Sequence, residues 1–405
     1  MILAVATGNE DVTGFWSKMA AMNDLKWYST FFFLIGASFG FADPVTDTLT
    51  LAEYYKENHR RWFKWGVVFM ISPCLLFVVV DTLTDDSLRN CTDLLRTLPY
   101  KLNPFSPAWA SFKAFLLCLK NFKKLWRGED IDYEDDEIND VNRLIRYVNL
   151  APFTEAIMES VPQFIIQLYA ANVQEEPVKI IQIISLSVSC LSIVWAFTAA
   201  DDFLHEREIE VRIKDKVLFF IGNFFFLTSR LLVICYIILR FRILIFVIVV
   251  FHSVIVTVLD CCPCEITLQR IAIGMFFICL RWIRDDLCVP FDEQDVANRR
   301  TRLRKMQWLS HVMFLIENIA IIVVVYNVSK FSNNWYAFPV TVYVCTASIL
   351  GSSIRLFHFR FLLKGPVAPE ANVTNEDLEA AGLAIQQVLM NVFELGQAWQ
   401  SAHQC

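Results

Sequence analysis

The sequence lacks the motifs that mark most enzymes. It has no Gly-rich phosphate-binding loop, no nucleophile triad and no metal-hydrolase motif. Its twelve cysteines are scattered, and the one dense group, Cys261-Cys262-Pro263-Cys264, has no second cysteine pair or histidine cluster nearby. A zinc site is therefore disfavoured, while S-acylated or plain thiols remain open. These absences predict a protein that is not an enzyme and holds neither metal nor cofactor.

The first residues lack the usual targeting signals. The segment MILAVATGNEDVTG has no basic start and only a short apolar patch, so it does not predict a cleaved signal peptide. Residue 2 is isoleucine rather than glycine, which excludes N-myristoylation at that position.

Apolar residues dominate the rest of the chain. Of the 405 residues, 56% are hydrophobic, and the mean hydropathy is +0.44. The apolar residues come in long runs, which is typical of helical integral membrane proteins. We therefore expect an all-α, polytopic membrane bundle.

Eight apolar segments are long enough to be read as membrane spans, and a ninth, 271–280, is short and predicts a re-entrant piece. The predicted spans are 27–51, 65–83, 149–172, 180–200, 217–239, 243–259, 308–328 and 335–357.

Basic residues set the expected orientation. Lysine and arginine are densest in 84–147 and 281–305, which should both be cytoplasmic. This assignment places both termini in the cytoplasm. It divides the chain into an N-terminal segment (1–26), a transmembrane bundle (27–362) and a cytoplasmic tail (363–405).

The loop 84–147 has two distinct parts. Residues 109–127 form an amphipathic, basic piece, and the acidic run 128–140 is expected to be a solvated loop. The basic charges could attract anionic lipid, but the positive-inside rule alone produces the same pattern.

The third predicted span carries a polar stripe. Glu155, Glu159, Gln163 and Gln167 recur every four residues, which places them along one side of a helix. Pro162 removes a backbone donor within this span and predicts a kink. Ionisable groups at membrane depth cost roughly 2.5–3.5 kcal/mol each and usually face a protein interior or a wet cavity.

The residues of this stripe also carry a resemblance to a known family. Glu159-Ser160-Val161-Pro162-Gln163 with Gln167-Leu168-Tyr169 is similar to a motif of the XK-related membrane proteins. Weaker matches lie at Asp43 and Asp47, at Arg230, at Glu317-Asn318 and at Phe357-His358. Together these matches spread over roughly residues 30–360.

The resemblance implies a bundle built from two related halves with a hydrophilic path of charged residues inside the membrane. Several XK-related proteins are phospholipid scramblases, some are activated by caspase cleavage, and a C-terminal helix can plug the cytoplasmic side. Within this chain the repeat is faint: Glu159…Tyr169 and Glu317…Tyr326 have similar but unequal spacing.

A polar lipid path is the central hypothesis from the sequence. Its expected members are Asp43, Asp47, Glu155, Glu159, Gln163 and Arg230. The alternative is that Arg230 pairs with Glu155 or Glu159 and that this pair only fixes the packing. Six such groups exceed what packing requires, so we favour the path.

The tail predicts a regulatory helix. After Asn375, a candidate cap, Leu378, Ile385, Leu389, Val392, Phe393 and Trp399 recur at helical spacing. Cleavage at Asp377 would release this helix. Asp295, Asp135 and Asp11 lie in other short acidic matches to a caspase site.

The predicted function is passive movement of phospholipids across the plasma membrane, exposing phosphatidylserine in dying cells and so promoting their engulfment. The expected partners are membrane phospholipids, a caspase, and a single-span chaperone or a lipid-transfer protein; no nucleic acid is expected. Two rival classes stay open. One is a solute transporter or channel, and the other is a non-transporting scaffold for a lipid-transfer protein.

Overall fold

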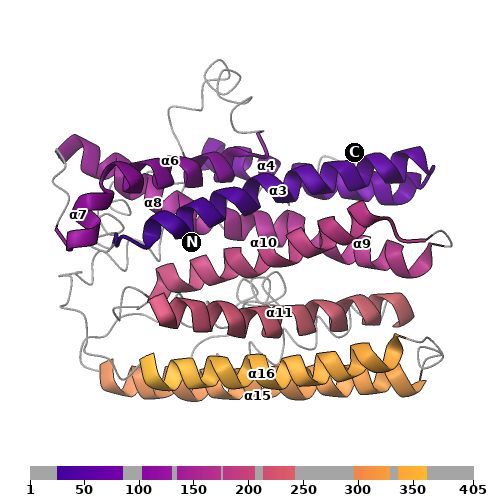
Figure 1. The fold of residues 1–405 in the computed structure, drawn as a ribbon. Helices are drawn as coiled ribbons and strands as arrows, with labels where there is room; N and C mark the ends of the chain where they lie inside the picture. Colours follow the sequence, from indigo (N-terminus) through magenta and orange to yellow (C-terminus); the bar gives the residue numbers. More distant parts are fainter. Residues whose placement is uncertain are drawn as a thin grey trace, which may run out of the picture.

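A computed structural model of the chain describes residues 25–84, 103–129, 135–174, 177–205, 213–241, 296–328 and 336–362. Every regular element in these ranges is helical (Figure 1). The elements are α3 (Ser29–Lys56), α4 (Arg60–Thr84), α6 (Ser106–Lys120), α7 (Phe122–Arg127), α8 (Asp135–Glu155), η3 (Ala156–Ser160), α9 (Val161–Val173), α10 (Ile180–His205), α11 (Ile213–Phe241), α15 (Val296–Val328) and α16 (Ala337–Leu362).

The long helices run roughly parallel or antiparallel to one another (Figure 1). Helices α3, α4, α6 and α8 form one side of the bundle, and α10 packs on α3 and α8. Helix α11 follows, and α15 and α16 complete the opposite side. Helix α11 therefore lies between the two sides and packs on both α10 and α16.

Three described helices are long and apolar enough to cross a membrane. These stretches are Ile180–Ala200, Ile213–Phe241 and Ala337–Phe357, with mean hydropathies of 2.1, 2.0 and 1.5. A shorter apolar stretch, His311–Asn327, lies in α15. The all-helical class is confirmed, and the eight-span count stays a prediction.

Seven of the eight predicted spans coincide with described helices, although several boundaries differ. Helix α4 begins five residues before the predicted 65, and α15 begins twelve residues before the predicted 308, so that the basic run 299–305 is helical. The sixth predicted span (243–259) and the re-entrant piece (271–280) lie outside the described residues.

At Pro162, where the sequence predicts a kink, the structure shows a change in the helical hydrogen bonding. Regular α-helical bonding is replaced by a single π-helical turn, η3, immediately before α9, and Pro162 is the second residue of α9. A proline cannot donate to the carbonyl four residues earlier, which here belongs to Met158. The hydroxyl of Ser72 donates to that carbonyl at 3.0 Å, so α4 supplies the missing hydrogen bond.

The charge of the acidic run 128–140 predicts a solvated loop, and this prediction is wrong for its last six residues. Residues 135–140 form the first turns of α8. Negative side chains are favourable at a helix N-terminus, where the backbone N–H groups point outward, so this charge is compatible with a helix.

The basic piece forms two helices, α6 and α7, which meet at Asn121. Helix α6 begins with Pro107 in its first turn and packs along α3 and α8 rather than extending into solvent. Its small residues allow this close approach: a Cβ added to Gly40 of α3 would lie 3.0 Å from that of Ala108. The start of α6 therefore lies beside the middle of α3.

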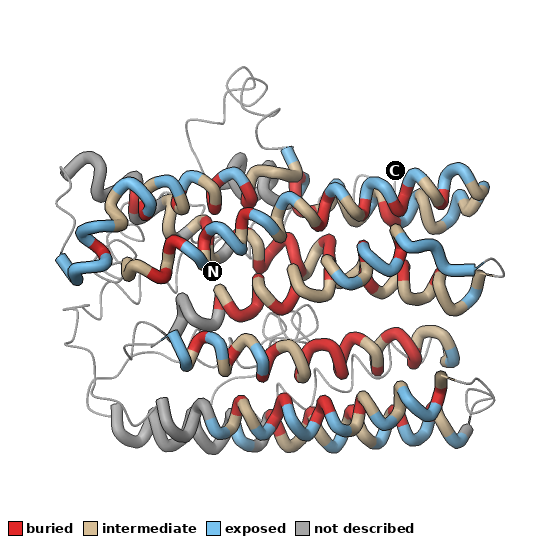
Figure 2. Tube along the Cα trace, viewed as in Figure 1, coloured by how far each residue is buried: buried red, intermediate tan, exposed pale blue. Residues whose placement is uncertain are grey.

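An apolar core rich in phenylalanine joins the two sides of the bundle. It contains Phe153, Phe164, Phe197, Phe219, Phe226 and Phe314 from five different helices. Buried positions are especially dense along α11, in the middle of the bundle (Figure 2). Helices α11 and α16 approach closely because Gly351 faces the backbone of Phe226.

Replacing Gly351 with alanine should destabilise the protein. The added Cβ would lie 2.5 Å from the backbone nitrogen of Phe226, and backbone atoms cannot move aside without separating α11 from α16. We expect a loss of about 1–3 kcal/mol, measured as a lower melting temperature in detergent. Ser353→Ala, on the exposed face of α16, is the control and should melt like the wild type. Equal melting of both variants would contradict the close contact.

Candidate functional site

Four carboxyl groups lie in the interior of the bundle. Asp43 and Asp47 belong to α3, Glu155 ends α8, and Glu159 lies in the π-helical turn. All four side chains are at most 9% exposed, and Asp47 is fully buried. We call these four residues the carboxylate cluster.

Serine hydroxyls from neighbouring helices hold the two aspartates. Ser160 donates to Oδ2 of Asp43 at 2.7 Å, and Ser189 donates to Oδ1 at 2.6 Å. Ser185 of α10 donates to Oδ1 of Asp47 at 2.7 Å. The aspartates therefore join α3 to both α10 and the π-helical turn.

The glutamines of the predicted stripe lie against the same cluster. Gln167 donates to Oδ1 of Asp47 at 2.9 Å, and Gln163 donates to the carbonyl of Gly66 in α4 at 2.8 Å. The polar stripe on 155–167 thus faces the bundle interior, as the sequence predicts.

The cluster retains hydrogen-bonding capacity that the protein does not satisfy. Buried oxygens without a hydrogen-bond partner among the described residues include Oδ2 of Asp47, Oε1 of Glu159, and Oε1 of Gln163 and of Gln167. None of the four carboxylates forms an ion pair with any described residue, and the described residues contain no group of histidines, cysteines and acids suited to a metal. Within the described part of the chain, the cluster is therefore a concentration of acceptors without a cationic partner.

Arg230, the sixth predicted path residue, lies in a different group. Its Nη2 pairs with Oε1 of Glu317 at 3.1 Å, and its Nη1 donates to Oδ1 of Asn318 at 2.8 Å. The guanidinium also lies 5.0 Å from the ring centre of Phe314. The alternative hypothesis, a pair between Arg230 and Glu155 or Glu159, is wrong, because Glu317 and Asn318 belong to α15.

A second buried arginine was missed in the sequence. Arg355 of α16 is fully buried, donates to Nε2 of His311 at 3.0 Å and hydrogen-bonds Oδ1 of Asn223. Its guanidinium also lies over the rings of Phe219 and Phe226. Arg230 was singled out because it is a charged residue inside a predicted span. Arg355 lies inside the predicted span 335–357, so the same criterion would have identified it. We call Arg230 and Arg355 the arginine pair.

The two charged groups lie on opposite sides of the apolar core. Phe153 and Phe164, in α8 and α9, lie in the stretch that also carries Glu155, Glu159 and Gln163, whereas Phe226 and Phe314 contact the arginine pair. The polar groups therefore form two clusters of opposite sign with phenylalanines between them. The described residues of the predicted path therefore fall into these two clusters rather than into one continuous row.

The remaining predicted residues are placed as follows. Tyr169 is partly buried in α9. Asp135 is the first residue of α8. The cleavage candidates Asp11, Asp295 and Asp377, the cysteines 261–264 and the tail helix all lie outside the described residues.

Comparison with known proteins agrees with the motif resemblance. A family model for XK-related proteins matches residues 31–364, which is well over half of the chain. A search among curated proteins gave no match. XK-related proteins are membrane proteins, generally not enzymes, and some of them are scramblases. The chain is therefore a multi-pass membrane protein of the XK-related family.

Proposed function

We propose that this protein moves phospholipids passively between the two leaflets of the plasma membrane and so exposes phosphatidylserine. The observation that carries this proposal is the carboxylate cluster, four buried acids that form no ion pair with any described residue of the bundle. Such groups are expensive in a membrane protein and are usually functional rather than structural.

The physical role of these groups would be to lower the barrier for a lipid headgroup. A headgroup that crosses the hydrocarbon layer loses its hydration, and polar groups along its way replace part of the lost hydrogen bonding. Most phospholipid headgroups combine a phosphate with a cationic nitrogen. The carboxylates suit the nitrogen, and the arginine pair suits the phosphate. No energy source is required, because lipid moves down its own gradient.

The biological setting follows from the predicted topology. We propose that both termini are cytoplasmic and that the tail helix blocks the path from that side. Caspase cleavage at Asp377, Asp295 or Asp11, or binding of a single-span partner, would remove the block in dying cells. Exposed phosphatidylserine would then promote engulfment.

The direct test is reconstitution of the purified chain into liposomes with a fluorescent phospholipid and a membrane-impermeant quencher. Scrambling predicts quenching well beyond the outer-leaflet half of the label. Flux of a soluble tracer without lipid movement would instead favour a transporter or channel. Lipid that stays in its leaflet, together with retained binding of a lipid-transfer protein, would favour the scaffold.

Glu159→Gln should separate function from stability. Glu159 has no hydrogen bond to a described residue, and its Oε1 is buried without a partner, so removing its charge lowers the cost of burial. We expect an unchanged or higher melting temperature and a scrambling rate that falls up to about tenfold, the effect of raising the barrier by 1.4 kcal/mol.

The matched control is Glu129→Gln, an exposed position two residues beyond the end of α7, which should leave both quantities unchanged. If Glu159→Gln lowered the melting temperature and left flux intact, the cluster would be structural, and this role in lipid transport would be wrong.

Arg230 and Glu317 should behave as a coupled pair. Arg230→Gln removes the ion pair of Glu317 and should cost about 1–3 kcal/mol in stability, less than for a fully buried pair because Glu317 is 21% exposed. Arg230→Gln with Glu317→Gln should recover most of that loss in a double-mutant cycle of melting temperatures. Additive losses would contradict the pairing.

Deleting residues 370–405 should raise the scrambling rate if the tail helix blocks the path. The reason is its apolar stripe, which the sequence leaves without a core of its own. The measurement is the same quenching assay on full-length and shortened protein, with size-exclusion profiles to confirm that both are folded. An unchanged rate in a well-folded deletion would remove the tail from the mechanism.

A further inference from the structure

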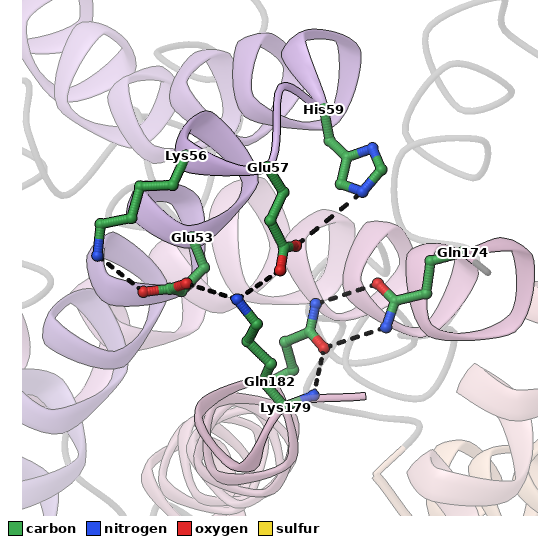
Figure 3. A network of polar contacts seen from close by, with 7 residues as sticks. All are labelled: Glu53, Lys56, Glu57, His59, Gln174, Lys179 and Gln182. Atoms are coloured by element: carbon green, nitrogen blue, oxygen red, sulfur yellow. Dashed lines mark hydrogen bonds and ion pairs between the residues drawn. The ribbon is translucent and has the colours of Figure 1, made fainter. Parts of the chain in front are cut away.

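One end of the bundle carries an ionic contact that joins two separate helix connections. The ammonium of Lys179, just before α10, lies 2.9 Å from Oε2 of Glu53 near the end of α3 and also pairs with Glu57 in the α3–α4 turn (Figure 3). We call this three-residue contact the Lys179 clamp. It ties the α3–α4 turn to the connection between α9 and α10.

Polar residues at and beside the α9–α10 connection hold the backbone of Lys179 in place. The amide of Lys179 donates to Oε1 of Gln182 at 2.9 Å. Gln182 and Gln174 exchange hydrogen bonds in both directions, at 3.2 and 3.3 Å, across the α9–α10 connection (Figure 3). Gln182 is almost fully buried. The backbone that carries Lys179 is thus held in place independently of the clamp.

The clamp lies in the same seam as the carboxylate cluster. Helices α3 and α10 are antiparallel partners, and Glu53 faces Lys179, Asp47 faces Ser185, and Asp43 faces Ser189. From one facing pair to the next, the residue numbers change by the same amount on α3 and on α10, so the register between the two helices is continuous. Six residues, roughly 9 Å of helix, separate the clamp from Asp47 and its partner Ser185.

Glu53 and Lys179 remain charged over a wide pH range. The lysines, mainly Lys179, lower the pKa of Glu53 to about 2, and Glu53 and Glu57 raise the pKa of Lys179. Glu53 lies beyond the predicted span 27–51. A lowered carboxyl pKa stabilises the folded form above the ordinary value of 4.5, and that contribution is lost only as the pH falls towards 2. Salt, rather than pH, should therefore weaken the clamp under ordinary conditions.

We propose that the Lys179 clamp is a latch that keeps the α3–α10 seam closed over the carboxylate cluster, and that its release admits lipid headgroups from this end. The predicted topology places this end outside the cell. The proposal rests on the proposed lipid-scrambling function. Lys179 is 42% exposed, so the contact is partly screened by solvent and weak enough to open reversibly. A release of this size regulates the rate of movement without unfolding the bundle.

The chain offers a matched pair of variants to test the latch. Lys56 also contacts Glu53, at 2.9 Å, but it lies three residues away on the same helix and pairs with no described residue across the seam. Lys179→Met and Lys56→Met each remove one cation from Glu53, and only the first opens the connection between the helices. Lys179→Glu adds repulsion and should act like Lys179→Met, but more strongly.

The experiment combines two readouts on the full chain. In liposomes, Lys179→Met should raise the scrambling rate about two- to fivefold over wild type. It should also reduce the increase of the scrambling rate with salt concentration. Lys56→Met should leave the rate and its salt dependence near those of the wild type. Hydrogen exchange should become faster in segments 53–60 and 179–185 in Lys179→Met alone. The exchange readout does not depend on lipid movement.

The outcomes distinguish the latch from the underlying function. If the wild type scrambles lipid, and Lys179→Met scrambles at the same rate as Lys56→Met, the latch is overturned. The proposed function would then remain intact. Lipid movement absent from every variant would overturn the proposed function, and faster exchange in Lys179→Met would then assign the clamp a structural role only.

Discussion

The interior of this bundle is organised by the need to stabilise buried carboxylates. An isolated acid in an apolar interior costs several kcal/mol, and each of Asp43 and Asp47 is compensated by hydroxyl or amide donors from another helix. Those donors lie on α9, α10 and the π-helical turn. The register between α3 and α10, the position of the turn before Pro162 and the inward face of α9 all depend on these hydrogen bonds. Asp47 and Glu159 nevertheless each keep one buried oxygen without a hydrogen-bond partner among the described residues, which packing alone does not require.

The phenylalanine-rich core gives this arrangement a second constraint. It separates an acidic region on one side of the bundle from the arginine pair on the other, and both regions are held by partners of their own. A lipid headgroup would meet charges of opposite sign on the two sides of α11. Movement of a headgroup past these regions would therefore need the seam between α3 and α10 to open, since the carboxylates are buried in this structure.

Sequence reasoning predicted the helical class, seven described helices and the inward polar stripe, because these depend on local hydropathy and spacing. It misjudged residues 135–140, whose charge resembles a loop but suits a helix N-terminus. The alternative that it left open for Arg230, a pair with Glu155 or Glu159, is wrong, since a span position does not say which neighbouring helix a side chain faces. The partnership of Asp47 with Ser185 was not predicted either. Serine is neutral and small, so hydropathy gives no sign of which serines meet a carboxylate across the bundle.

The most direct test of the central claim is to ask where the headgroup goes. A phospholipid with a photoreactive group on its headgroup would be incorporated with the full chain into liposomes, irradiated, and mapped by peptide mass spectrometry. The account predicts crosslinks on the peptides that carry Asp43–Asp47 and Ser185–Ser189. Crosslinks confined to exposed faces, such as those around Trp109 of α6 and Phe338 of α16, would show that lipid moves without entering the carboxylate cluster.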